Sequence, residues 1–123
     1  MANEITVSIT FKAVKGYLNI QNAVSSSWTL NAAAPNSAGG TQLIGTTGDA
    51  IALGNVATNG WAFFQNCDAT HFVEIGYWDG AAFNPVFRLN AGEAGVFRIA
   101  QGAAPYARAN TAAVVLKKEI IDN

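Results

Sequence analysis

The chain has 123 residues, a length that fits one domain able to bury a hydrophobic core without metal ions or disulfides. Half of its residues are hydrophobic and 12% are charged, with a formal net charge of -1 from seven basic and eight acidic side chains. Because these charges form no runs, the composition argues against nucleic acids and membrane surfaces as ligands. So small a charged fraction also predicts that part of the apolar surface lies against a partner protein.

The cysteine count and the apolar runs exclude further classes of protein. Cys67 is the sole cysteine, which rules out an internal disulfide or a multi-cysteine metal site, and we expect it to be a small buried hydrophobe. Residues 1–4 lack the basic and apolar regions of a signal peptide, so we expect no secretion by that route. No apolar run approaches the ~20 residues needed to span a bilayer. We therefore expect a soluble chain or a soluble subunit.

The N-terminal region predicts antiparallel strands. Ile5, Val7, Ile9 and Phe11 alternate with polar residues, which is the period of a strand with one buried and one solvent-facing side. We predict this strand over residues 4–14, followed by a break at residues 15–16. A second strand is predicted over residues 17–24 and, after three serines, a short third strand over residues 28–30.

The middle of the chain predicts one long loop and a central strand. Residues 31–41 are Ala, Pro, Asn, Ser and Gly with one Thr, and this composition favours the longest loop of the chain. The apolar segments 42–45 and 49–53 predict either a hairpin or one strand bent at a glycine bulge. Residues 61–66 have two mostly apolar sides, which is typical of a central strand with core on one side and a second cover or an oligomer contact on the other.

The next segments carry the clearest turn signals. Residues 66–70 predict a turn in which Asp68 caps backbone N–H groups two residues on. A strand follows over residues 71–78 with Gly76 as a candidate bulge. Asp79-Gly80 predicts a two-residue type I′ hairpin turn, because both central residues of that turn need positive φ. Pro85 has no N–H to donate, so the strand predicted over residues 81–89 should lie at a sheet edge or contain a bulge.

The C-terminal third predicts further strands. We expect a turn at residues 90–93, a strand over residues 94–100 and a loop over residues 101–105. Residues 111–121 contain both helix-favouring and β-branched residues, and we predict a strand because the neighbouring elements are strands. Eight or nine short strands without a convincing helix predict an all-β fold, an antiparallel β-sandwich of jelly-roll or Greek-key type that forms a single domain over residues 1–123.

Few residues offer catalytic chemistry. His71 is the only histidine and the only potential general base of its kind, with Asp68 and Cys67 nearby in sequence. Their strand-and-turn spacing does not bring the thiol and the imidazole together, and no motif supplies an oxyanion hole. We expect Asp68 to cap its turn and His71 to lie at a surface or interface. We predict no enzyme, no catalytic residues, no cofactor and no metal site, and a small hydrolase is the lowest-ranked hypothesis.

The tryptophans and arginines are better suited to binding a partner than to catalysis. Flat rings such as those of Trp28 and Trp78 can bind sugars on a β-sandwich, although core or subunit contacts are the more common use of rings in apolar strands. Arg88, Arg98 and Arg108 stand singly among apolar residues, where arginines often make interface hydrogen bonds.

The turn motifs of the C-terminal half carry a resemblance. An Asn-x-Asp-x-Thr turn at residues 66–70 precedes a Val-x-Ile-Gly strand at residues 73–76. A Leu-x-x-Gly-Glu turn at residues 89–93 leads to another strand, and the segment 106–111 follows near the C-terminus. In these motifs the chain resembles small β-sandwich virion structural proteins of tailed bacteriophages.

The resemblance implies a capsid cement or decoration protein that binds the major capsid protein and itself. Such a protein would be a homo-oligomer, a dimer or a trimer, on the capsid surface of a virion that is assembled in the host cytoplasm. The alternative is a tail, fibre or host-recognition module that binds carbohydrate. A terminal arm, the long loop and isolated large side chains are the expected contacts, because an unpaired arm can add to a neighbour's sheet. The predicted partner-binding residues are Ala2, Asn3, Glu4, Trp28, Pro35, Asn36, Trp78, Arg88 and Arg108.

Overall fold

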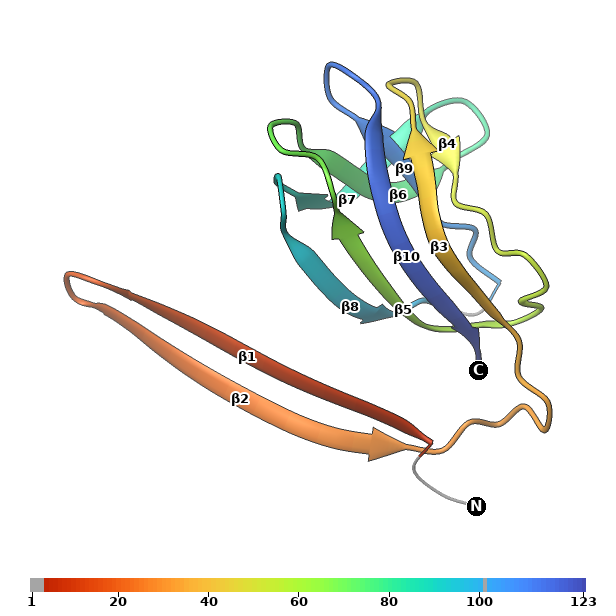
Figure 1. Cartoon of the computed structure of the whole chain (residues 1–123), viewed down its shortest axis with the longest axis horizontal. Helices are drawn as coiled ribbons and strands as arrows, with labels where there is room; N and C mark the ends of the chain where they lie inside the picture. The colour runs from red at the N-terminus through yellow and green to blue at the C-terminus, as the bar shows by residue number, and fades with distance from the viewer. Residues whose placement is uncertain (1–3, 101) are drawn as a thin grey trace. The chain divides into compact units, whose positions relative to one another are not determined.

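The computed structural model describes residues 4–100 and 102–123, and within these ranges it contains ten strands and no helix (Figure 1). The predicted all-β class is confirmed. None of the described residues belongs to a helix long and apolar enough to cross a membrane. The chain divides into two compact units, one that ends at Ala33 and one that runs from Ala34 to Asn123. Every strand of the sandwich lies in the second unit. The single domain predicted over residues 1–123 stays a prediction.

The first unit is a long β-hairpin. Strands β1 (Ile5–Lys15) and β2 (Leu18–Trp28) pair antiparallel along their whole length, joined by a two-residue turn at which Gly16 has a φ of 58°. Strand β2 continues through residues 25–27, so the separate third strand predicted over residues 28–30 is wrong. The serines do not interrupt the strand because their hydroxyls bond across it: Ser25 Oγ lies 2.9 Å from Ser8 Oγ.

The second unit is an eight-stranded jelly roll. Its two sheets have the strand orders β3-β10-β5-β8 and β4-β9-β6-β7, so the first strand pairs with the last, the second with the seventh, and so on inward. This nested pairing is the jelly-roll arrangement, which confirms the predicted fold type. The strands are β3 (Ser37–Ile44), β4 (Asp49–Ala50), β5 (Asn59–Asn66), β6 (Val73–Trp78), β7 (Phe83–Leu89), β8 (Ala94–Arg98), β9 (Tyr106–Ala109) and β10 (Val114–Asp122).

Two predictions about the early strands are wrong. The loop predicted over residues 31–41 is shorter, because β3 already begins at Ser37 and its glycines pair with the end of β10. Strands β3 and β4 form neither a hairpin nor one bent strand, because they pair with β10 and β9 in different sheets. The chain turns the corner between them at residues 45–48, where Gly45 N donates to Asp49 Oδ2 at 2.7 Å.

The predictions that residues 61–66 form a central strand and that the strand with Pro85 lies at a sheet edge are confirmed. Strand β5 lies between β10 and β8, and β7 lies at a sheet edge with Pro85 in it. The register shifts at Gly76, as expected of a bulge, and a Cβ there would overlap the carbonyl oxygen of Asn84. The β6–β7 connection is a hairpin, but its loop has four residues instead of two. Asp79 Oδ1 accepts hydrogen bonds from the N–H groups of Ala81 and Ala82, both at 2.8 Å, which stabilises the wider loop.

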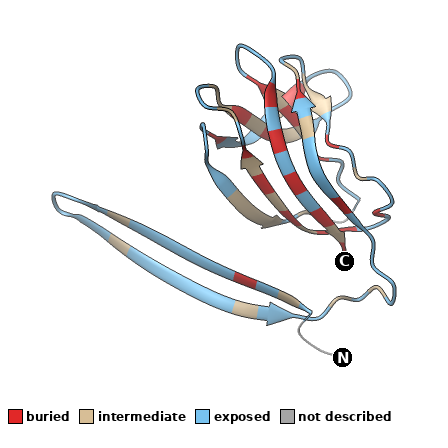
Figure 2. Cartoon of the chain, viewed as in Figure 1, coloured by how far each residue is buried: buried red, intermediate tan, exposed pale blue. Residues whose placement is uncertain are grey.

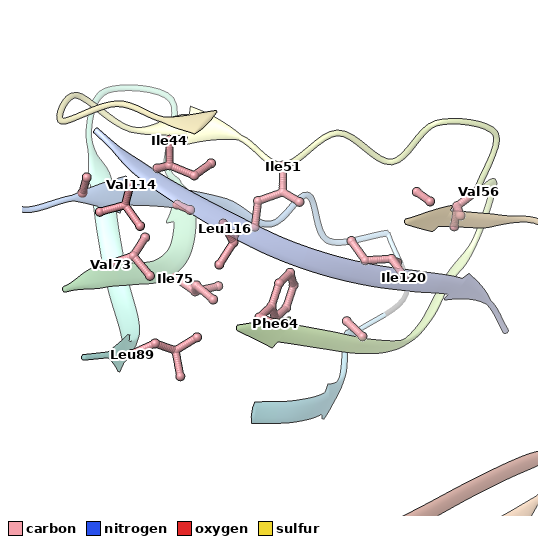
Figure 3. Packing of buried hydrophobic residues seen from close by; sticks show 14 residues of the cluster. Ile44, Ile51, Val56, Phe64, Val73, Ile75, Leu89, Val114, Leu116 and Ile120 are labelled. Atoms are coloured by element: carbon pink, nitrogen blue, oxygen red, sulfur yellow. The ribbon is translucent and has the colours of Figure 1, made fainter. Parts of the chain in front are cut away.

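The C-terminal strand carries the regular pattern of the core. Residues of β10 alternate between buried and exposed, as Figure 2 shows, and the predicted strand is confirmed. Strand β9 was not predicted, because its inward residues are alanines that give a weak apolar signal. Inward side chains from both sheets form one cluster (Figure 3). Its largest fully buried members are Phe64, Ile44, Leu116, Ile120, Val73 and Val114.

Candidate interaction surfaces

The β1–β2 hairpin has two chemically different faces. The register places the odd-numbered residues of β1 opposite the even-numbered residues of β2 on one side of the ribbon. We call this side the apolar ribbon face; its apolar members are Ile5, Val7, Ile9, Phe11, Ala13, Leu18, Ile20, Val24 and Trp28. We call the other side the polar ribbon face; its polar members are Thr6, Ser8, Thr10, Lys12, Asn19, Gln21, Ser25 and Ser27.

The apolar ribbon face is exposed at its middle, whereas Val7 near its base is buried. Phe11 is 59% exposed, Val24 60% and Ile9 49%, and most of the hairpin is exposed in Figure 2. The side predicted to be buried is thus mostly open, because a two-stranded ribbon has no second layer of its own. An isolated hairpin is marginally stable in water, and a large exposed apolar patch marks an interaction site. This face is the strongest candidate site of the chain.

Charges are distributed unevenly along the hairpin. Lys12 and Lys15 lie in the half of β1 near the turn, and the exposed Tyr17 lies in the turn itself. The opposite end, which we call the base, carries Glu4, whose Oε2 accepts a hydrogen bond from the N–H of Leu30 at 3.2 Å. Among the residues that the structure describes, the two lysines of β1 thus lie near the tip and Glu4 lies at the base.

An apolar cavity of about 270 Å³ lies in the jelly roll between the edge strands of its two sheets. Phe87 of β7 and Phe97 of β8 both line it, and their rings stack with centroids 4.3 Å apart. Ile75, Val86 and Pro105 are among the other residues that line it. We call this cavity the edge pocket; its size suits one or two apolar side chains.

The outer side of the β4-β9-β6-β7 sheet carries an aromatic and charged group, which we call the outer cluster. The rings of Trp78 and Tyr106 stack with centroids 6.0 Å apart. Arg108 Nη2 donates to Glu74 Oε1 at 2.8 Å, and its guanidinium carbon lies 4.7 Å from the centre of the Phe83 ring. Trp78 remains 40% exposed, so its ring offers a surface to a ligand or a partner.

The residues weighed as a catalytic group form a turn. Asp68 Oδ1 accepts hydrogen bonds from the N–H of Thr70 at 2.8 Å and of His71 at 2.7 Å, as predicted for a capping residue. These backbone donors, His71 first, lower the pKa of Asp68 from its usual 3.8 to about 2. Cys67 is exposed, in contrast to the prediction that it is buried, because it lies in the turn after β5. Its sulfur lies 3.8 Å from the carbonyl oxygen of Gln65.

One cation lies on the inward side of the jelly roll. Lys118 of β10 is 5% exposed and its ammonium group donates to the carbonyl oxygen of Ala52. Burial lowers the pKa of Lys118. The residues that the structure describes contain no group of three or more His, Cys, Asp or Glu side chains able to hold a metal ion.

The predicted partner-binding residues fall into several places. Ala2 and Asn3 lie outside the described residues, whereas Glu4 and Trp28 lie in the hairpin unit and Trp28 is on the apolar ribbon face. Trp78, Arg88 and Arg108 all belong to the β4-β9-β6-β7 sheet. Arg88 lies over the ring of Phe72, with its guanidinium carbon 3.8 Å from the ring centre.

The remaining predicted residues, Pro35 and Asn36, are exposed in the segment before β3. Asn36 N donates to Asp122 Oδ2 at 2.7 Å, so its backbone is already used to fix the end of β10. Sequence analysis did not predict the exposure of Ile9, Phe11 and Val24. Their alternating pattern was the available signal, and it was assigned to burial within the chain.

Comparisons with models of known protein families, with curated proteins and with solved structures find no match to this chain.

Proposed function

We propose that this chain is a structural subunit of a bacteriophage virion, a cement or decoration protein that stabilises the capsid by binding the major capsid protein and copies of itself. The apolar ribbon face is the observation that carries the proposal, because a face with residues such as Phe11 59% exposed needs a protein cover. The proposed location is the outer surface of the shell, after assembly in the host cytoplasm. Neither nucleic acid nor membrane is a proposed ligand.

The division of the chain into two units supports this role. A jelly roll with a continuous core gives a rigid platform, and jelly rolls are common among viral capsid domains. The hairpin strands have 11 residues each, which makes an arm roughly 35 Å long at ~3.4 Å per residue. An arm of this length can reach a neighbouring subunit. The motif resemblance to virion proteins of tailed phages points to the same role.

The test is binding to shells. Purified chain is mixed with capsid shells of the virus that encodes it and sedimented, and the bound copy number is measured. We expect saturable binding that Phe11→Lys weakens at least tenfold, while Thr10→Lys on the polar ribbon face leaves it unchanged. A chain that stays in the supernatant at all concentrations contradicts the proposal.

A tail or host-recognition module is the second candidate, and the outer cluster is the observation that favours it. The half-exposed ring of Trp78, stacked on Tyr106, is a surface on which a sugar ring can lie. The measurement is a glycan array with wild type, Trp78→Ala and Trp28→Ala. Binding that either substitution removes favours this candidate, and a blank array with intact shell binding removes it.

A further inference from the structure

We propose that the free edge of strand β8, together with the edge pocket beside it, binds an extended segment of a partner protein as an added antiparallel β-strand. The segment carries a large apolar side chain that enters the pocket and an acidic residue next to Arg98. The proposal deepens the proposed function, on which it rests for the partner being a capsid protein, because it names a surface and the chemistry of the segment that binds there.

Strand β8 leaves one row of backbone groups without a partner. It is the last strand of the β3-β10-β5-β8 sheet and pairs with β5 (Figure 1). Ile99 N donates to Gly60 O at 2.9 Å, and bonded positions alternate along an antiparallel strand, so the N–H and C=O groups of Ala94, Val96 and Arg98 face away from β5. Among the described residues, none forms a backbone hydrogen bond with these groups. We call this row the open edge; an extended chain is the ligand that pairs with such alternating donors and acceptors.

The open edge lacks the features that usually prevent strand addition. Natural sheet edges are protected by proline, by charged side chains or by bulges. Strand β7, the edge of the other sheet beside the pocket, contains Pro85, which has no N–H to donate. Strand β8 contains no proline, its pairing with β5 has no register shift, and its one charged residue lies at its end. Of the two edges beside the edge pocket, β8 is therefore the one that can accept a strand.

The edge pocket lies where the inward side chains of an added strand would point. Residues opposite one another on neighbouring strands have their side chains on the same side of the sheet. Phe97 points inward against the core and lines the pocket, together with Ile75 and Val86 of the facing sheet. A leucine, isoleucine or phenylalanine opposite Phe97 would therefore enter an apolar space of about 270 Å³. Main-chain bonds would supply affinity, and the pocket would select the side chain.

Arg98 predicts the charge of the segment. It is the single charged residue among the described residues that line the pocket, and none of their ion pairs involves it. Its Nη1 donates to Asn123 Oδ1 at 2.8 Å, and a guanidinium has further N–H groups with which to bind a carboxylate. Because Arg98 follows Phe97, the acidic and the apolar residue of the segment should be adjacent.

The first test is the binding of a labelled peptide to the full chain, measured by fluorescence anisotropy. The probe is Val-Glu-Leu-Thr-Val-Thr with blocked ends, which in antiparallel pairing places glutamate opposite Arg98, leucine opposite Phe97 and the first threonine opposite Val96. We expect saturable binding that replacement of the leucine by serine weakens at least about tenfold. A flat anisotropy up to the solubility limit of the chain overturns the proposal.

Two N-methylated forms of the same peptide test the backbone pairing. N-methylation of the first threonine removes the donor that faces the carbonyl oxygen of Val96 and should abolish binding. N-methylation of the leucine is the matched control, because its N–H faces away from β8 and binding should be unchanged. Equal binding of the two methylated peptides overturns strand addition.

Variants of the chain test the open edge from the other side. Val96→Pro removes an outward N–H and no bond to β5, so the dissociation constant of the peptide should rise at least tenfold, whereas Val96→Thr should bind as wild type does. Near-UV circular dichroism checks the fold, and if Val96→Pro does not fold, the N-methylated peptides decide the same point. Arg98→Gln should weaken binding about two- to fivefold for the glutamate peptide and leave a glutamine version unaffected.

Light scattering of the chain alone separates a partner from a second copy. A dimer that Val96→Pro dissociates would mean that β8 pairs with another copy of this chain, and it would overturn the proposal. We expect Val96→Pro to leave the molar mass of the chain unchanged.

The site and the proposed function fail separately. Shell binding that survives Val96→Pro, without any binding of the peptide, overturns the site and leaves the cement function intact. Peptide binding by a chain that does not sediment with shells supports the site and contradicts the cement function.

Discussion

Strands β1 and β10 have similar alternating sequences but different surroundings. In β10 the inward residues Val114, Leu116 and Ile120 are fully buried beneath a second sheet. In β1 the corresponding residues Ile9 and Phe11 are about half exposed. Alternation thus predicts a strand and its apolar side, but it does not say which molecule covers that side. A two-stranded ribbon has no second layer of its own, so its apolar side stays exposed.

The comparison predicts that aromatic residues in the two units differ most in their effect on stability. Phe64→Ala in the jelly-roll core should lower the free energy of unfolding by about 3–5 kcal/mol, because it removes a fully packed side chain and leaves a cavity. Phe11→Ala should change the jelly-roll unfolding by less than about 0.5 kcal/mol at monomer concentrations, as expected for an exposed site. Urea unfolding of both variants measures the difference. Equal losses would mean that the two units share one core.

Glycine substitutions in the two units should also differ in their effect on the stability of the jelly roll. Gly76→Ala should destabilise the jelly roll by about 1–3 kcal/mol, because the added methyl overlaps the backbone of Asn84. Gly16→Ala has open space around it and strains only the hairpin turn, where φ is 58°. Unfolding of the jelly roll should therefore be unchanged in that variant. A stable Gly76→Ala protein would contradict the tight approach of β6 and β7.

The Asp68 turn should make the stability of the jelly roll depend on pH. Its folded-state pKa is lowered to about 2 from 3.8, so the ionised form stabilises the folded jelly roll above pH ~4, and this contribution is lost as pH falls toward 2. Asp68→Asn should have a lower thermal midpoint than wild type at pH 6, and the two midpoints should converge between pH 4 and 2. A gap that is independent of pH would show that the hydrogen bonds, and not the charge, matter.

Deletion of the whole hairpin unit is expected to have the smallest effect on the stability of the jelly roll. Removal of residues 1–33 should leave the unfolding midpoint of the jelly roll unchanged, because the core cluster is built from residues 38–120. Scanning calorimetry of the full and shortened chains at low concentration measures this. A large drop in the midpoint would instead support a single domain over residues 1–123.

Local chemistry was predicted well where the decisive partners are close in sequence. The Asp68 cap, the Gly76 bulge and the edge position of the strand with Pro85 each follow from one residue and its backbone needs. The Asp79 loop was assigned the wrong length, since the sequence does not show that its carboxylate would accept two N–H groups and support four residues.

Long-range pairing was the part that could not be predicted. Residues 42–45 and 49–53 look like neighbours, yet their strands join different sheets because their partners are β10 and β9 near the other end of the chain. The exposure of Ile9 and Phe11 could not be predicted for a related reason. A single sequence does not distinguish an apolar side that meets its own core from one that meets another molecule.

The nested strand pairing has a consequence for synthesis on the ribosome. Ser37 pairs with Ile121, so the β3-β10-β5-β8 sheet cannot close until Ile121 has left the exit tunnel. The hairpin needs only local contacts and can form in about 1–10 μs as soon as it emerges, long before contacts between distant strands are possible. Truncated products that end before Val114 would contain a folded hairpin joined to an unfolded jelly-roll segment, and cellular proteases should remove them quickly.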